Sequence, residues 1–66
     1  MNNMLNEQTS ELEFLEHLAF SLFQSEQFFD SAICYERIIE LDPSHAKAYY
    51  NLGVVLHDMG QFDYSL

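Results

Sequence analysis

The stretch DPSHAKAYYNLG, residues 42–53, decides the fold of this chain. Proline has no N–H to donate, and the residue before a proline avoids the helical region, so Asp42-Pro43 predicts that one helix ends just before it. Ser44 supplies a side-chain oxygen that can cap the next helix. Four residues then follow at the spacing of one helical stripe: Tyr49, Leu52, Gly53 and Leu56. The stretch therefore predicts a turn followed by a helix over about residues 45–58.

Two more helices are predicted before this stretch. The first covers about residues 11–24, where Ser10 and Glu13 have the spacing of a capping box. The second covers about residues 28–41 and follows the polar link QSEQ. Their apolar stripes are Leu15, Leu18, Ala19 and Leu22 in the first, and Phe28, Ala32, Tyr35 and Ile39 in the second. Residues 1–10 are expected to form a flexible N-terminal tail.

The sequence repeats itself at a shift of 34 residues. The shift carries Leu15 onto Tyr49, Leu18 onto Leu52, Ala19 onto Gly53, Leu22 onto Leu56, Phe28 onto Phe62 and Ser31 onto Ser65. The small residues Ala19, Gly53 and Ser31 would let neighbouring helices approach closely. Gly60 suits a helix C-terminus, and residues 62–66 would open a further helix. A period of this length is typical of a solenoid built from helix–turn–helix units.

In these features the chain resembles the tetratricopeptide repeat family. In the first repeat the resemblance rests on LEHLAFSL (15–22), on Ser31 and Tyr35, and on LDP (41–43). In the second repeat it rests on YYNLGVVL (49–56) and Ser65. The stretch DPSHAKAYYNLG between them is close to a family consensus. The resemblance implies an all-α fold, with an antiparallel helix-turn-helix hairpin followed by a third helix. The first repeat would cover residues 11–43, and a second, incomplete repeat would cover residues 44–66. We therefore expect the chain to be the N-terminal part of a longer repeat protein.

The resemblance also implies a function, namely binding of a protein or peptide partner in a concave groove lined by the first helix of each repeat. By this analogy the groove residues are Glu13, Glu16, His17, Phe20, Phe23, Gln24, Lys47, Tyr50, Asn51, Val54 and His57. A subset of the family clamps the C-terminal carboxylate of chaperones with Lys and Asn. Glu16 and Phe20 stand at two of those places, and the charge of Glu16 would repel a carboxylate. The expected ligand is therefore an apolar or basic segment, with Phe20 and Phe23 as its anchors.

Composition and charge narrow the class of partner. The chain has 66 residues, room for one small domain, and its 48% hydrophobic content favours a packed fold. Eleven acidic residues against two basic ones give a net charge of -9, which disfavours nucleic acid and anionic membranes and favours cationic partners. The single cysteine, the absence of a signal-like start and the lack of a long apolar run predict a cytoplasmic protein.

Self-association is the alternative function. An unfinished repeat leaves the apolar stripe of its helix uncovered, and a second copy of the chain could cover it in a homodimer. The residues expected on this surface are Tyr49, Leu52, Val55, Leu56 and Phe62.

The sequence predicts neither an enzyme nor a cofactor. Cys34 has no basic neighbour that would stabilise a thiolate. Glu13 and His17 are one helical turn apart, but two ligands do not make a metal site, so a metal- or substrate-binding domain is the weakest of the three hypotheses. The chain has no Gly-rich phosphate loop and no Ser-His-Asp arrangement.

Overall fold

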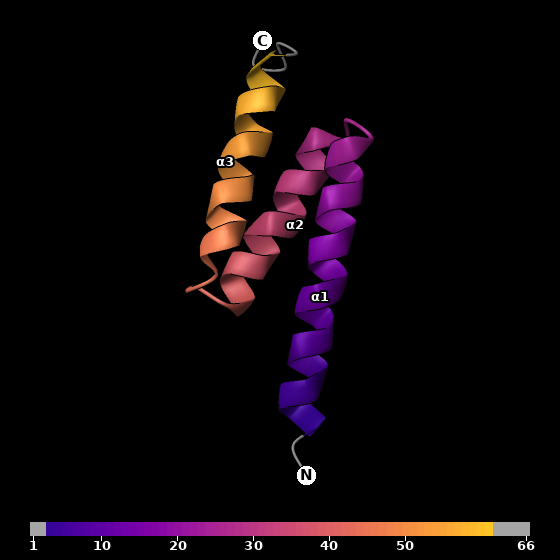
Figure 1. Ribbon diagram of the computed structural model, residues 1–66, viewed down its shortest axis with the longest axis vertical. Helices are drawn as coiled ribbons and strands as arrows, with labels where there is room; N and C mark the ends of the chain where they lie inside the picture. The colour runs from indigo at the N-terminus through magenta and orange to yellow at the C-terminus, as the bar shows by residue number, and fades with distance from the viewer. Residues whose placement is uncertain (1–2, 62–66) are drawn as a thin grey trace.

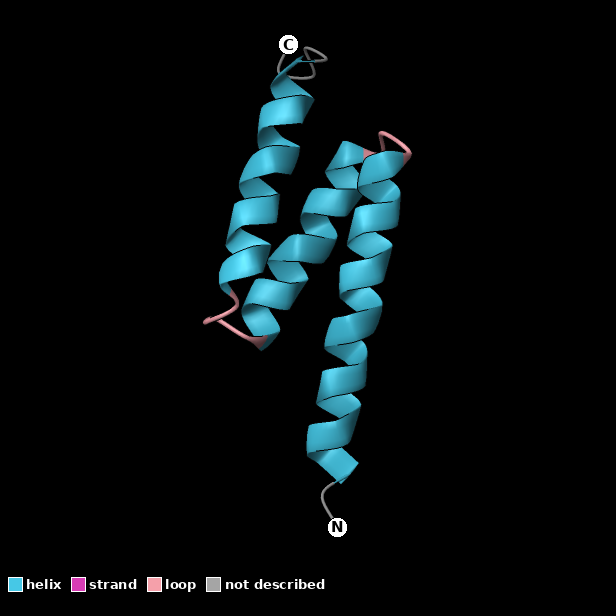
Figure 2. Ribbon diagram, in the orientation of Figure 1, coloured by secondary structure: helices cyan, strands magenta, loops and turns pink. Residues whose placement is uncertain are grey.

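The computed structural model describes residues 3–61 of the chain, with the side chains of residues 10–60. It contains three helices, α1 (Asn3–Gln24), α2 (Phe28–Leu41) and α3 (Ala46–Gln61). Short connections join them, and no strand occurs in residues 3–61 (Figure 2). The predicted all-α fold is therefore confirmed.

The second helix lies between the other two. α2 packs against α1 on one side and against α3 on the other, and each neighbour runs antiparallel to it (Figure 1). This is the predicted hairpin followed by a third helix. Because α2 fills the middle position, α1 and α3 face each other across its surface, and this arrangement leaves a groove between them.

The core is made from one face of each helix. Its buried apolar residues are Ala19, Phe28, Ala32, Cys34, Tyr35, Ile38, Ala48 and Val55. Partly buried side chains packed around them are Leu12, Leu15, Leu22, Phe23, Ile39, Leu52 and Met59. Most of the buried residues belong to α2, as expected for a helix with a neighbour on both sides.

A short polar contact joins α1 to α2 within their buried interface. Ser31 and Ala19 are completely buried, and the Ser31 hydroxyl donates a hydrogen bond of 2.7 Å to the Ala19 carbonyl oxygen. The hydroxyl therefore has a partner despite its burial, which removes the cost of an unsatisfied polar group. Small residues thus occupy the helix contact, as the sequence predicted for this pair.

The start of α1 differs from the prediction. The helix begins at Asn3, so the expectation of a flexible tail over residues 1–10 is wrong for residues 3–10. Ser10 consequently lies inside the helix and is not its cap, and the proposed capping box with Glu13 does not form there. The physical reason is that residues 3–10 contain no Pro or Gly to stop a helix, while Met, Leu, Glu and Gln all favour one.

The start and end of α3 also differ from the prediction. Ser44 does not cap the helix, because its hydroxyl donates to Asp42 Oδ1 at 2.8 Å. His45 takes this role, since its Nδ1 accepts a hydrogen bond of 3.1 Å from the Ala48 N–H. At the other end α3 continues to Gln61, so Gly60 is helical and does not mark the C-terminus.

The expected further helix over residues 62–66 lies outside the described residues. Among residues 3–61, none of the helices has both the length and the apolar character required to cross a membrane.

Candidate peptide-binding groove

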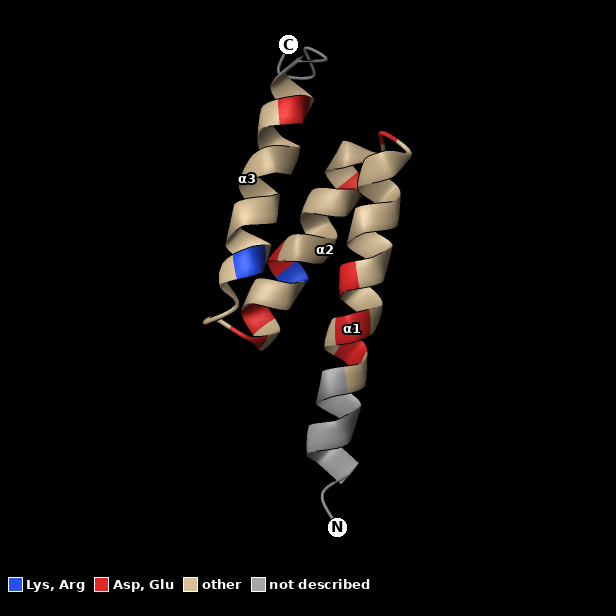
Figure 3. Ribbon diagram, in the orientation of Figure 1, with Lys and Arg blue, Asp and Glu red and all other residues tan. Residues whose placement is uncertain are grey.

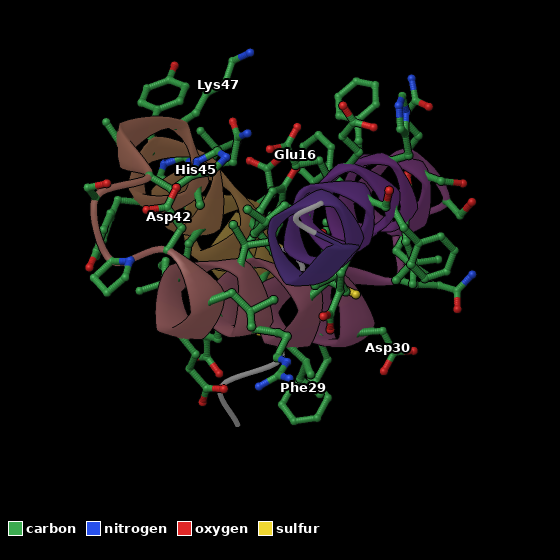
Figure 4. The ribbon with its side chains drawn as sticks, turned by 90° about the horizontal axis from the view of Figure 1, so that it is seen from below. Glu16, Phe29, Asp30, Asp42, His45 and Lys47 are labelled. Atoms are coloured by element: carbon green, nitrogen blue, oxygen red, sulfur yellow. The ribbon has the colours of Figure 1, made fainter. Side chains whose placement is uncertain are left out.

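A groove lies between α1 and α3, with α2 as its floor. It holds one cavity of about 320 Å³, lined by Glu16, His17, Phe20, Tyr35, His45, Lys47 and Asn51. A smaller cavity of about 40 Å³ adjoins it, lined by Phe20, Phe23, Tyr35, Asn51, Val54 and Val55. The two cavities share Phe20, Tyr35 and Asn51, so they belong to one surface. In Figure 4, Glu16 and His45 lie between α1 and α3 on this side of the molecule, and Lys47 stands at its edge.

The structure brings many of the expected groove residues together. Those that line the cavities are Glu16, His17, Phe20, Phe23, Lys47, Asn51 and Val54. Those that line neither cavity, although all are exposed, are Glu13, Gln24, Tyr50 and His57. Three lining residues were not expected in the groove, namely Tyr35, His45 and Val55, the last of which was expected on the self-association surface. Tyr35 has the helical spacing of a core residue, and His45 gives no signal beyond its place just before a helix.

The apolar part of the groove is a ladder of phenylalanine rings. Phe20 is 52% exposed, and its ring stacks on Phe23 with centroids 6.4 Å apart. Phe23 is half-buried and packs in turn on the core residue Phe28 at 5.6 Å. The contact with Phe23 therefore restricts the position of the Phe20 ring, while about half of the Phe20 surface stays accessible to a ligand. Aromatic pairs of this kind add about 0.5–1.5 kcal/mol beyond their buried area.

The polar part of the groove is organised by His45. Its Nδ1 accepts the hydrogen bond from Ala48, so the ring proton must be on Nε2 in the neutral form. Nε2 lies 2.6 Å from Glu16 Oε2 and donates to that carboxylate. The imidazole thus joins the first turn of α3 to α1 at this end of the groove.

Tyr35 contributes its hydroxyl to the floor. Burial raises the pKa of Tyr35, the negative charge of Glu16 and the nearby Cys34 raise it further, and a side-chain hydrogen bond with Asn51 acts in the opposite direction. The phenol therefore stays protonated and neutral at physiological pH. Because the hydrogen bond with Asn51 lowers this pKa, the phenol oxygen is its acceptor, and the O–H can still donate to a ligand backbone.

The surface expected for self-association is only partly open. Tyr49 and Leu56 are each about half exposed, with 51% and 50% of their surface accessible. Leu52 is partly buried against the core. Val55 is 1% exposed, so the expectation that it lies on an open face is wrong, because this residue belongs to the buried core. Phe62 lies outside the described residues.

The candidate catalytic and metal-binding residues do not form a site in the part of the chain that the structure describes. Burial, with a smaller effect of the Asp30 charge, raises the pKa of the Cys34 thiol, which disfavours the reactive thiolate. Glu13 and His17 are not joined by a third ligand, since no group of three His, Cys, Asp or Glu side chains is gathered among the described residues.

Comparison with known proteins gives one match. A family model described as tetratricopeptide repeat matches residues 34–66, which begin within α2 and include all of α3. No curated protein and no solved structure matches the chain. The matched residues include DPSHAKAYYNLG, where the repeat pattern of the sequence is strongest. The match covers half of the chain, and together with the three antiparallel helices it shows that this protein belongs to the tetratricopeptide repeat family, whose repeats are protein–protein interaction modules.

Proposed function

We propose that the chain binds an apolar or basic peptide segment in the groove between α1 and α3. The observation that carries this proposal is the position of Phe20, a half-exposed aromatic ring held in place by Phe23 at the junction of the two groove cavities. A rigid, partly exposed aromatic is the type of residue that contributes most to binding energy at interfaces. An apolar side chain of the ligand would pack on this ring and on Val54 opposite.

The charge of the groove supports a basic ligand over an acidic one. Glu16 lines the larger cavity, and Glu13 is exposed one turn earlier on the same helix. Part of the Glu16 carboxylate is engaged by His45 Nε2 at 2.6 Å, and its other oxygen is not used in that contact. Lys47 at the edge is the only cation that lines these cavities. A ligand with Lys or Arg next to its apolar residue would meet these carboxylates, whereas a terminal carboxylate would be repelled.

The proposal can be tested by selecting peptides from a displayed random library and measuring the binding of one selected peptide by fluorescence anisotropy. We expect the selected peptides to combine Leu, Ile or Phe with Lys or Arg. Phe20→Ala should weaken binding at least tenfold, which corresponds to about 1.4 kcal/mol. Phe14→Ala is the matched control, because Phe14 is an exposed phenylalanine of the same helix that lines neither groove cavity. Equal effects of the two variants, or selection of acidic peptides, would refute groove binding.

A second candidate function is self-association through the outer face of α3. Gly53 favours it, because a Cβ at this position would meet nothing within 4 Å, and no described neighbour requires a glycine there. A glycine inside a helix costs roughly 1 kcal/mol relative to alanine. Close approach of another helix, next to the exposed Tyr49 and Leu56, would give the glycine a packing role.

Sedimentation over a concentration series distinguishes the two candidates. If a second copy covers this face, the parent chain should dimerise and Leu56→Glu should give a monomer. Phe20→Glu should leave such a dimer intact and remove only peptide binding. A parent chain that stays monomeric at high concentration would exclude self-association.

A further inference from the structure

Another cavity lies away from the groove, at the end of the molecule where α1 connects to α2. Its volume is about 410 Å³, and it is lined by Glu26, Gln27, Phe28, Phe29, Asp30 and Met59. These residues come from the α1–α2 connection, the first turn of α2 and the last turns of α3. None of them lines the two groove cavities. We call this the connection-end cavity, and its volume is within the usual range of about 300–1,000 Å³ for ligand pockets.

The wall of the connection-end cavity is apolar. Phe28 is buried in the core, Met59 is partly buried against it, and Phe29 is 70% exposed. In Figure 4 Phe29 points away from the groove side that holds Glu16 and Lys47. Two aromatic rings and a flexible thioether can accept one apolar side chain of a ligand, and burying Phe29 would remove an exposed large aromatic from water.

The rim of the connection-end cavity is acidic. Glu26 and Asp30 both belong to its lining. The two basic residues of the chain, Arg37 and Lys47, lie toward the opposite ends of α2 and α3 (Figure 3). Arg37 is in addition engaged by Glu40 at 3.1 Å and lies 3.7 Å from Glu11. Neither Arg37 nor Lys47 therefore lies at this end to balance the charges of Glu26 and Asp30.

Helix dipoles increase the preference for a cation. The C-termini of α1 and α3 are both at this end, and neither helix has a basic residue in its last turn. Helix C-termini carry partial negative charge and are stabilised by a nearby cation. Asp30 has a role within the fold, since it lies in the first turn of α2 and complements that N-terminus. Glu26 has no comparable role, so its position calls for another explanation.

The backbone of Glu26 supports a functional reason for this carboxylate. α1 ends in a Schellman motif, in which the Gln27 N–H donates to the Leu22 carbonyl at 2.9 Å and the Glu26 N–H donates to the Phe23 carbonyl at 3.0 Å. Glu26 occupies the left-handed position of the motif, with φ of 63°. Glycine is favoured at this position, and a glutamate is strained there. The chain thus carries a carboxylate at the rim in a conformation that disfavours it.

We propose that the connection-end cavity is a second docking site, which binds a segment of a partner protein that presents an apolar side chain flanked by Lys or Arg. The apolar side chain would fill the space between Phe29 and Met59, and the basic residues would pair with Glu26 and Asp30. Charge complementarity selects this occupant. A second copy of the chain carries the same net charge of -9 and would be repelled at this rim.

The test uses three short peptides, acetyl-GKFKG-amide and its analogues with Ser or Glu in place of both lysines, titrated into the ¹⁵N-labelled chain. We expect the lysine peptide to shift the amide signals of residues 26–30 and 59. Its affinity should exceed that of the serine peptide at least threefold and weaken as salt is added, and the glutamate peptide should bind least. Shifts confined to the groove, or equal affinity for the three peptides, would overturn the second site, and the first of these results would leave the groove proposal intact.

Variants separate the charge effect from the apolar effect. Glu26→Gln combined with Asp30→Asn should remove the preference for the lysine peptide over the serine peptide. Phe29→Ala should weaken both peptides. The matched control is Glu36→Gln, which removes an exposed acidic charge of α2 outside the cavity lining and should change neither result. If Glu36→Gln reduced the preference as much as the double variant, the effect would come from net charge and the site would be refuted. Glu26→Gln alone provides the same test should the double variant fail to fold.

Discussion

His45 Nε2 lies 2.6 Å from Glu16 Oε2, and this contact links the start of α3 to α1 across the groove. The same imidazole accepts a hydrogen bond from the Ala48 N–H through Nδ1. One side chain therefore both caps a helix and joins the two walls of the groove. The sequence separation of 29 residues between His45 and Glu16 makes this a tertiary contact that no local pattern contains.

Replacing His45 should separate its two roles. His45→Ala loses the cap and the contact with Glu16, and we expect a loss of about 1–2 kcal/mol in the free energy of unfolding. His45→Asn keeps a good cap but is too short to reach Glu16, so it should lose about half as much or less. Urea unfolding of the two variants and the parent measures this difference. Equal losses for Ala and Asn would show that capping contributes little.

Glu26→Gly should stabilise the protein. The left-handed backbone of Glu26 is strained for any residue with a Cβ, and we expect a gain of about 0.5–1 kcal/mol in the free energy of unfolding. Glu26→Gln is the control, because it removes the charge and keeps the strain, so its gain in stability should be smaller than that of Glu26→Gly. Thermal unfolding of the three proteins tests the prediction. A gain of equal size for Gln and Gly would mean that charge, and not the backbone, limits stability at this turn.

The contact between Ser31 and Ala19 should tolerate loss of the hydroxyl better than added volume. Ser31→Ala removes one buried hydrogen bond, for a cost of about 1 kcal/mol. Ser31→Val adds methyl groups where α1 and α2 are in close contact, and it should cost roughly 1–3 kcal/mol or more. Urea unfolding of both variants gives the two losses in the free energy of unfolding. A larger loss for Ser31→Val than for Ser31→Ala would show that close packing matters more at this position than the hydrogen bond. A Val variant as stable as the Ala variant would contradict the close approach.

Stability should fall at alkaline pH. Burial, followed by the effect of Asp30, raises the pKa of Cys34 above its ordinary value of 9.0, and burial first, then Glu16 and Cys34, raises that of Tyr35 above 10.0. In the folded state both groups therefore keep their protons up to a higher pH than in the unfolded chain. The free energy of unfolding should therefore be unaffected by them below about pH 8 and should fall as the pH rises through the values of the unfolded chain.

The thiol contribution can be isolated with Cys34→Ala. This variant is less stable at every pH because it leaves a cavity, but its curve should be flatter than that of the parent between about pH 8 and pH 10. Unfolding midpoints in urea at several pH values under reducing conditions provide the measurement. Parallel curves for the two proteins would show that Cys34 does not titrate differently on folding.

The sequence was sufficient to predict the order and packing of the helices, because these follow from apolar spacing and from small residues. The stripe through Ala19 and the position of Ser31 determine where α1 meets α2, and Pro43 interrupts the chain between α2 and α3. Much of the groove wall could also be predicted, since residues such as Phe20 and Asn51 lie on faces fixed by the helical period.

Details that depend on competition between contacts could not be predicted. Ser44 has the chemistry of a helix cap, but Asp42 engages its hydroxyl and His45 becomes the cap. The capping spacing of Ser10 is not used, because nothing before it stops the helix. The Schellman position was missed because it carries Glu26 in place of the usual glycine. For Ser44 the local pattern allowed two outcomes, and the contact with Asp42 decided between them.

The measurement that tests groove binding most directly is a map of amide shifts in the ¹⁵N-labelled chain as a selected apolar and basic peptide is added. We predict that the largest shifts lie in residues 16–23 of α1 and 47–54 of α3, with Phe20 and Asn51 among them, and that Phe20→Ala abolishes them while Phe14→Ala does not. Shifts that avoid both groove walls would contradict the proposed function. So would shifts that persist in Phe20→Ala.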